Sequence, residues 1–520
     1  MSSNALQKRP PHSIHTVLTR HPAGRGFVAG AVAGAATVTA MYLVGLLTGL
    51  QPLPQLLQQP LLDALPGPAF GFLIDNLQHL GKVVEEAGLI AGMVVALAAW
   101  GAVYGRVRST REVPGLAMIM GGLAWAVTTL VLLPFSGDGL LGLNEGVAAP
   151  ITWAVLYVTY AIILEAGYER WLARPASDDA LDPGRRQLLR MVPVLVGGGS
   201  LLVLGVRLLP GWYQSVVTPP ESGLTGPSPE ITPVSNFYVV SKNFSDPVVS
   251  EAGWTLEVKG LVQHPQRLSL SALRALPSSE ETVTMECVSN NVGGPLMSTG
   301  VFSGIPLRDL LALAGPQASA TTVAFNARDG YTESLPLSLV MGAPEILVVH
   351  SLAGAPLPDR HGFPARIITP GHYGVKSPKW LESIEVVAGD RNGYWENQGW
   401  ERNAIIKTTA RIDIPRDGFL LKLGPIDIAG VALAGTRRIA TVEVSTDGGR
   451  NWLPANLRAP LSPLAWTLWS LTWTPDREGA YTLQVRARDG EGRLQAAVTA
   501  PSYPDGASGF HTVRVNVTAK

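Results

Sequence analysis

Five long apolar segments crowd into residues 27–209 of this 520-residue chain, at 27–50, 88–105, 114–135, 148–167 and 191–209. Each is close to the roughly 20 residues that an α-helix needs to cross a bilayer. Buried helices of a large soluble domain are the alternative, but five such stretches in one continuous region favour membrane spans. We therefore expect residues 27–209 to form an α-helical transmembrane bundle of five spans, in contact with membrane lipid.

The loops between these segments alternate in charge, which predicts the topology. Basic residues gather before the first span, after the second and after the fourth, namely Lys8, Arg9, Arg20, Arg25, Arg106, Arg108, Arg111, Arg170, Arg174, Arg185, Arg186 and Arg190. The other two loops are acidic, and basic loops stay in the cytoplasm. We therefore expect residues 1–26 to be cytoplasmic and everything after residue 209 to lie outside a multi-pass cell-membrane protein, on its periplasmic or cell-surface side.

Two further features bear on the membrane region. The run Gly184-Arg-Arg-Gln-Leu-Leu-Arg190 precedes the last span and resembles a twin-arginine export signal, whose pathway carries folded proteins. The spans carry no central histidine, and the chain has no His-Pro-Gly-Gly run, so we expect no haem in this chain. An anchor or docking bundle is the interpretation that these features favour.

The remainder of the chain has the composition of a soluble protein. Residues 210–230 are rich in Pro, Gly and Ser and predict a linker. Short strands and helices mix over 231–400, which predicts an α+β domain, with a strand at 254–260 and a Ser-capped helix at 269–276. Over 401–520, alternating segments at 440–446, 481–488 and 510–517 predict an immunoglobulin-like β-sandwich. The 40 basic and 40 acidic residues cancel, which gives no case for a nucleic-acid partner.

Cys287 is the sole cysteine of the chain. The preceding residues 282–285 are β-branched and apolar and predict a buried strand that ends in a polar loop. A single thiol forms no disulfide within its own chain. It can be a small core residue, a nucleophile or a ligand for a soft metal.

Four later loops combine Arg, Lys and His with glycines, at 304–311, 327–334, 354–366 and 370–380. Glycine permits close approach of the backbone, and Arg can clamp a phosphate with two hydrogen bonds. Solvated turns with ordinary surface charge would explain any single loop. Four of them following one thiol favour a site for an anionic ligand.

From about residue 231 onward the chain resembles the sulfite oxidase family of molybdopterin enzymes, in both the cofactor domain and the dimerisation sandwich. The resemblance implies that the Cys287 thiolate ligates molybdenum, and Glu286 and Asn290 follow the family pattern beside it. It implies a molybdenum–molybdopterin cofactor, a small-molecule substrate, an unidentified electron-transfer partner and a homodimer through the sandwich. The implied cofactor contacts are Tyr238, Asp329, His361, Arg366, Ser377, Pro378 and Lys379.

The chain departs from the family where sulfite oxidases place arginines around the anion. The apparent counterparts here are Asn291, Val292, Phe244 and Ser462, and Trp400 stands in place of a site tyrosine. A doubly charged anion that loses such contacts loses about 1.5–3 kcal/mol for each. Sulfite is therefore not expected to be the physiological substrate, unless Lys242 or Lys376 points inward and restores part of the charge.

Two alternatives stay open from the sequence. Reduction of methionine sulfoxide or of another S- or N-oxide is favoured by the stretch Tyr373-Gly-Val-Lys-Ser-Pro-Lys379, although that branch of the family generally lacks the sandwich. A non-catalytic membrane protein that keeps the fold for binding is the other, and the intact Cys287 argues against it. Otherwise we expect oxygen-atom transfer to or from a small substrate.

Overall fold

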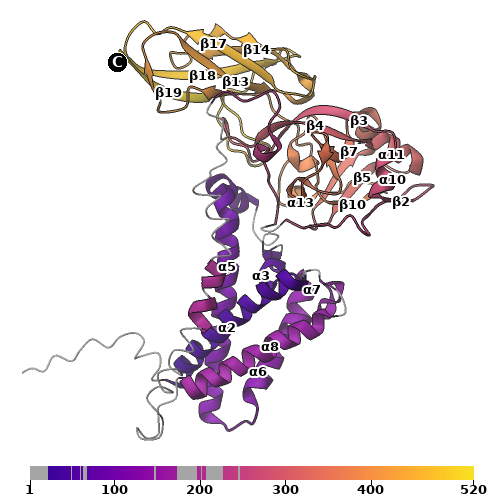
Figure 1. Cartoon of the computed structure of the whole chain (residues 1–520), viewed down its shortest axis with the longest axis vertical. Helices are drawn as coiled ribbons and strands as arrows, with labels where there is room; N and C mark the ends of the chain where they lie inside the picture. Colours follow the sequence, from indigo (N-terminus) through magenta and orange to yellow (C-terminus); the bar gives the residue numbers. More distant parts are fainter. Residues whose placement is uncertain are drawn as a thin grey trace, which may run out of the picture. The chain divides into compact units, whose positions relative to one another are not determined.

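The computed structural model describes residues 21–48, 50–58, 60–61, 67–136, 138–145, 148–171, 196–200, 202–205, 226–243 and 246–519. Its contacts form two compact units (Figure 1). One unit comprises Met1–Ala64 with His79–Val217, and the other comprises Leu65–Gln78 with Thr218–Lys520.

The apolar region is helical, as expected. Its elements are α2 (Pro22–Thr48), α3 (Leu53–Leu56), α5 (Gly67–Thr110), α6 (Leu116–Val127), η1 (Thr128–Leu132), α7 (Leu133–Ser136), η2 (Leu140–Glu145), α8 (Ala149–Ala166) and η3 (Gly167–Trp171). Four stretches are long and apolar enough to cross a membrane: Pro22–Thr48, Val83–Thr110, Leu116–Ser136 and Ala149–Glu169. These match the first four predicted spans.

The fifth predicted span, 191–209, is described only at 196–200 and 202–205, where it is helical. The structure therefore gives four candidate spans rather than the five expected. The arginine pair at 185–186 and the basic residues Lys8, Arg9, Arg20 and Arg174 lie outside the described residues.

Helices α2 and α5 approach closely through glycines. A Cβ added to Gly30 would lie 2.8 Å from the Leu97 carbonyl oxygen and 2.9 Å from the Gly101 Cα. Gly26 meets Gly101 and Gly105 in the same way one turn earlier. Small residues spaced four apart are typical of helix contacts inside membranes, where close backbone packing replaces the hydrophobic effect.

The first part of the other unit is an α+β domain with two sheets. One sheet has the order β2 (Gln266–Ser269), β1 (Thr255–Gly260), β10 (Leu381–Val387), β5 (Thr322–Ala327), β6 (Thr332–Pro336). The second has β3 (Ser279–Glu286), β4 (Met297–Pro306), β7 (Leu347–Leu352) and β8 (Ala355–Pro356), and β9 (Arg366–Ile368) also pairs with β7. Short helices connect them: η4 (Val234–Asn236), α10 (Leu270–Arg274), α11 (Leu307–Ala314), α12 (Leu337–Gly342), η5 (Asp359–His361), η6 (Gly374–Lys376) and α13 (Tyr394–Asn397).

Two local predictions for this domain are confirmed. The Ser269 hydroxyl accepts from the Ala272 N–H at 3.2 Å and caps α10. In β1 the alternating pattern buries Leu256 and Val258 completely. Their side chains join a core with residues of α10, α11, β5 and β10, and this core gives the domain a rigid base for its loops.

The C-terminal part is a sandwich of two sheets around one core (Figure 1). One sheet has the order β11 (Thr409–Ile414), β13 (Ile426–Leu433), β17 (Thr467–Trp473), β16 (Asn456–Leu457). The other has β12 (Leu420–Lys422), β19 (His511–Thr518), β18 (Gly479–Asp489), β14 (Ile439–Ser445) and β15 (Leu453–Pro454), with η7 (Gly435–Arg437) before β14. The alternating segments at 440–446, 481–488 and 510–517 are confirmed as strands β14, β18 and β19, and the immunoglobulin-type connectivity stays a prediction.

Candidate functional site

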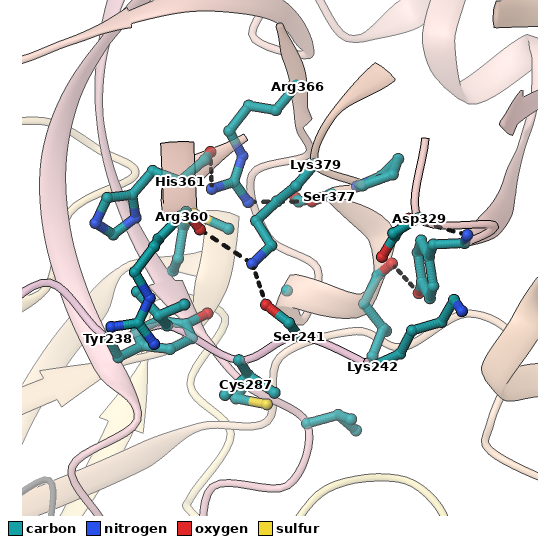
Figure 2. Close-up of a pocket in the computed structure, with 18 of the residues that line it drawn as sticks. Tyr238, Ser241, Lys242, Cys287, Asp329, Arg360, His361, Arg366, Ser377 and Lys379 are labelled. Atoms are coloured by element: carbon teal, nitrogen blue, oxygen red, sulfur yellow. Dashed lines mark hydrogen bonds between the residues drawn. The ribbon is translucent and has the colours of Figure 1, made fainter. Parts of the chain in front are cut away.

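One cavity in the α+β domain gathers the predicted site residues (Figure 2). Its empty space, counted with the open mouth, is about 880 Å³. The eight residues that the family resemblance implied all line this cavity: Tyr238, Cys287, Asp329, His361, Arg366, Ser377, Pro378 and Lys379. They come from loops that are far apart in the sequence, so the folded sheets bring them together.

Strand β3 delivers Cys287 to this cavity. The strand ends at Glu286, and a tight turn follows, in which the Asn290 N–H donates to the Cys287 carbonyl at 3.0 Å. The Cys287 N–H in turn donates to the Leu296 carbonyl at 3.0 Å, which closes the loop. The thiol is 7% exposed and lines the cavity. The loop therefore holds the sulfur in one place, at the boundary between the core and the cavity.

Glu286 and Asn290 brace this loop from behind. The Asn290 side-chain amide donates to Glu286 Oε1 at 3.0 Å, and its oxygen accepts from the Leu296 N–H at 3.0 Å. Burial raises the pKa of Glu286 to about 7. The pair thus fixes both ends of the cysteine loop, which explains why a polar pair is kept in a buried position.

Arg366 contributes a buried cation to the cavity. Its guanidinium donates to the carbonyls of His361 at 3.2 Å and Ser377 at 3.1 Å. Burial lowers its pKa to about 10, so it remains protonated at neutral pH. Among the described residues no carboxylate forms an ion pair with Arg366, and a buried charge of this kind requires a compensating anion.

Lys379 lies nearer the mouth of the cavity. Its ammonium donates to the Ser241 hydroxyl at 2.6 Å and to the Arg360 carbonyl at 3.1 Å, and it lies 4.2 Å from the centre of the Trp380 ring (Figure 2). Its neighbour Pro378 accepts a backbone hydrogen bond from Ile367 at 2.9 Å, which ties this stretch to β9. The stretch 377–379 therefore forms a fixed cationic wall.

The remaining predicted residues are largely buried around that wall. Burial, helped by Arg366, lowers the pKa of His361 to about 4, so its ring is neutral at ordinary pH. Burial raises the pKa of Tyr238 well above its usual value, so the phenol keeps its proton. Burial also raises the pKa of Asp329, whose carboxylate accepts from the Tyr331 N–H at 3.0 Å. His361 and Tyr238 therefore offer a ligand neutral polar groups rather than further charge.

The side of the cavity next to Cys287 is apolar and aromatic. Val288, Val375, Trp395 and Trp400 line it, and Trp395 and Trp400 meet edge to face with ring centres 6.5 Å apart. Val288 and Trp400 belong to a core that continues into the sandwich through Val431 and Leu433. A small molecule that approaches the thiol from this side meets a rigid hydrophobic surface.

Lys242 and Lys376, whose orientations the sequence did not determine, lie in different surroundings. Lys376 is buried and does not line the cavity; it pairs with Glu333 at 2.7 Å and also with Glu396. Burial raises the pKa of Glu333 to about 7. Lys242 lines the cavity, with its ammonium 5.3 Å from the centre of the Tyr394 ring. Of these two lysines, Lys242 is therefore the one that adds charge to the cavity.

Several lining residues were missed by sequence reasoning. Arg360, Ser241, Tyr331, Trp395 and Ser289 all line the cavity. Each lies within a few positions of a predicted residue or of Trp400. This closeness in the sequence is the signal that could have identified them. Of the residues that stand in place of arginines, Asn291, Val292 and Ser462 do not line the cavity, and Phe244 lies outside the described residues.

The sandwich packs directly on the strand that carries the cysteine. Thr284 of β3 donates its N–H to the Leu464 carbonyl at 3.0 Å, and Ser462 donates its hydroxyl to the Thr282 carbonyl. Arg411 of β11 donates to the Gly294 carbonyl of the cysteine loop at 2.8 Å and to the Ser228 hydroxyl at 2.9 Å. Ser228 belongs to the described end of the predicted linker, so that end is anchored to the sandwich.

Comparisons with known proteins match both the α+β domain and the sandwich. Residues 243–395 match the family model described as oxidoreductase molybdopterin binding domain, and residues 402–503 match the Mo-co oxidoreductase dimerisation domain. Sulfite oxidase of Arabidopsis thaliana is 30% identical over 293 residues, which is 46% of this chain and 72% of that protein.

Two other relatives share less of their length. The mitochondrial sulfite oxidase of Homo sapiens is 31% identical over 283 residues, covering 45% of this chain and 52% of that protein. NADH nitrate reductase of Solanum lycopersicum is 29% identical over 323 residues, covering 50% and 35% respectively. The chain thus spans about half the length of the human relative and about a third of the tomato one.

Proposed function

Because the chain belongs to the sulfite oxidase family of molybdopterin-dependent oxidoreductases, we propose that it is a membrane-anchored member of that family whose catalytic domain lies outside the cytoplasmic membrane. The enzyme class and the molybdenum–molybdopterin cofactor follow from the family match. The membrane anchor is supported by the four apolar helices. The outside location rests on the charge pattern of the loops.

The observation that carries the cofactor site is the charge of Arg366. A buried guanidinium that bonds only carbonyls needs an anion nearby, and the phosphate of a pterin cofactor would supply one. The cationic wall of Lys379 and the thiol of Cys287 lie on the same cavity. The donor set therefore fits a ligand with an anionic tail and a soft metal at its other end.

In this proposal Cys287 is the protein ligand of molybdenum, and Arg366, Lys379 and Ser377 hold the pterin. Tyr238, Asp329, His361 and Pro378 complete its binding site. When bound, the cofactor supplies the two-electron redox change that accompanies oxygen-atom transfer. The protein orients that group, keeps the thiolate away from bulk water and shapes access through the wall of Val288, Val375, Trp395 and Trp400.

The substrate that we propose is a small molecule with a neutral or apolar body rather than sulfite. The support is the apolar and aromatic surface that Val288, Val375, Trp395 and Trp400 give the cavity. A doubly charged oxyanion needs strong donors to replace its water. Lys242 and Arg360 line the cavity and count against this proposal, although the Arg360 side chain is 61% exposed and 3.5 Å from Asp246.

Reduction of methionine sulfoxide or of another S- or N-oxide is the second candidate. The apolar wall would accept the organic groups of such a substrate, and the cavity cations would remain with the cofactor.

We further propose that an electron-transfer protein or membrane carrier exchanges electrons with the site. The match of residues 402–503 to a dimerisation domain supports a homodimer through the sandwich.

The test uses the full chain purified in detergent. We expect about one molybdenum and one pterin per chain, and a binding protein that merely retains the fold would contain neither. Cofactor-replete protein is then assayed with sulfite and with sulfoxides, using artificial electron acceptors and donors. A specificity constant for sulfite of roughly 10⁴ M⁻¹s⁻¹ or more, the ordinary enzyme range, would refute the substrate proposal and leave the cofactor assignment intact.

A further inference from the structure

Ser289 lies beside the sulfur of Cys287 in the cavity. Its hydroxyl oxygen is 3.1 Å from Cys287 Sγ, and both residues line the cavity. Cys287 is buried, whereas Ser289 is half-buried. The hydroxyl therefore lies within hydrogen-bonding distance of the sulfur and is the more accessible of the two groups.

The backbone of the cysteine loop holds the hydroxyl in this position. Residues 287–290 form a turn closed by the 3.0 Å hydrogen bond from the Asn290 N–H to the Cys287 carbonyl. Ser289 is the third residue of that turn, so its side chain folds back toward the first. Val288, the residue between them, packs in the apolar core and prevents the turn from rotating. The turn therefore keeps the Ser289 side chain within reach of the sulfur.

We propose that Ser289 tunes the metal by donating a hydrogen bond to the Cys287 thiolate. This inference rests on the proposed role of Cys287 as a metal ligand. A thiolate has no proton of its own, so at this distance the serine must be the donor. The hydrogen bond withdraws electron density from the sulfur and weakens its donation to the metal, which stabilises the more reduced state. Ser289 is thus a positioning and tuning residue that raises the reduction potential of the site.

The environment makes this hydrogen bond effective. Val288, Trp395 and Trp400 line the same cavity, and a hydrogen bond is electrostatically stronger beside apolar groups than in water. In the proposed site, the sulfur of Cys287 is also the atom through which the protein would contact the metal. A change of one hydroxyl is therefore expected to alter the metal rather than the fold.

The experiment compares full-length, cofactor-loaded wild type with Ser289→Ala and Ser289→Thr. Ser289→Ala removes the hydroxyl with little loss of volume, whereas Ser289→Thr keeps it. Ser303→Ala is the matched control, because the Ser303 hydroxyl donates to Glu280 at 3.2 Å in the same domain and does not line the cavity. The readouts are molybdenum content, the reduction potential of the metal by redox titration, and the sulfur-to-metal charge-transfer absorption.

We expect Ser289→Ala to keep its molybdenum, to show a lower reduction potential and to move the charge-transfer band to longer wavelength. Ser289→Thr should restore both readouts, and Ser303→Ala should leave the band in place. An unchanged potential and band in metal-replete Ser289→Ala would overturn the tuning role alone. Wild-type protein without molybdenum would overturn the proposed function itself, so the two failures are distinguishable.

Discussion

The backbone N–H of Trp466 donates to the hydroxyl of Thr284 at 2.7 Å, three residues before Cys287. The same hydroxyl lies 2.5 Å from that of Thr299 on β4. Trp466 of the sandwich thereby joins the hydrogen bonds of β3, the strand that positions the thiol. Strand β3 is the edge of its sheet, and the segment 462–466 covers that edge. Edge strands expose unpaired backbone groups, so this cover also stabilises the strand.

Replacing the thiol tests the metal assignment. Cys287→Ser substitutes a hard and mostly protonated hydroxyl for a soft thiolate. We expect activity to vanish while the thermal unfolding temperature changes little, because the two side chains are similar in size. The measurement is a turnover assay beside a melting curve. Full turnover by the variant would refute the role of Cys287.

Removal of the cavity cations is expected to lower cofactor occupancy. Arg366→Ala and Lys379→Ala each delete a positive charge that we assign to the anionic part of the pterin. Arg366→Ala should also lower stability, since two buried carbonyls lose their donor at about 1–3 kcal/mol each. Pterin content per chain is the measurement.

The control for these variants is Arg328→Ala in the same domain. Arg328 is 63% exposed and pairs with Glu382 at 2.8 Å away from the cavity. The Arg328→Ala substitution removes the same charge from the protein and leaves the residues that line the cavity unchanged. Equal pterin content in all four proteins would contradict the carry-over of Arg366 and Lys379.

Arg411 is expected to couple the sandwich to the cysteine loop. Arg411→Leu removes the donor to Gly294 and leaves the buried Asp413 without its cation, which lies 2.7 Å away. Breaking a buried pair costs about 3–5 kcal/mol. We expect a lower unfolding temperature together with a lower molybdenum content.

Arg458→Ala serves as the matched sandwich control. Its side chain is 65% exposed and pairs with Glu230 at 2.7 Å, so about 0–1 kcal/mol is at stake. Wild-type stability and metal content in Arg411→Leu would show that the loop does not depend on the sandwich.

His511 is expected to make stability depend on pH. Its Nδ1 accepts from the Ile412 N–H at 3.0 Å, which requires a neutral ring, and burial lowers its pKa to about 4. The unfolded chain takes up a proton near pH 6.5, whereas the folded chain does so only near pH 4. The contribution of His511 is therefore complete above pH 6.5 and declines as the pH falls toward 4, by at most about 3 kcal/mol.

His511→Asn isolates this effect, because its amide oxygen can accept the same hydrogen bond but takes up no proton. Urea unfolding at pH 7 and pH 4.5 gives the comparison. The wild type should lose more stability than the variant between these pH values. Equal losses in both would rule out His511 as the group responsible.

The topology is tested with reporter fusions after Arg108 and after Pro219. The arginine-rich second loop is expected to hold the first reporter in the cytoplasm, and a fifth span would place the second outside. Alkaline phosphatase, which is active outside the membrane, and a fluorescent protein, which folds in the cytoplasm, are each fused at both positions. Detection of both positions on one side would refute the five-span arrangement.

Sequence reasoning predicted eight residues that line one cavity, because each belongs to a short motif that carries the family resemblance. The Ser269 cap and the alternation in β1 are likewise local patterns. The direction of Lys376 could not be read in this way, since it is decided by Glu333 and Glu396, which lie 43 and 20 residues away. The contacts of Arg411 and Trp466 with the cysteine strand depend on how two domains pack, and no pattern along the chain encodes that.

The contacts of the sandwich with the cysteine loop set an order for biosynthesis. The ring of His511 occupies the space against Gly293, and Arg411 holds Gly294. Cys287 is translated more than two hundred residues before His511, so the cysteine loop lacks this neighbour until the C-terminal strand has been made. The loop therefore gains its full set of sandwich contacts only after β19 has docked. A chain stopped short of β19 would keep the hydrogen bonds of Glu286 and Asn290 within the loop but would lack the cover of His511.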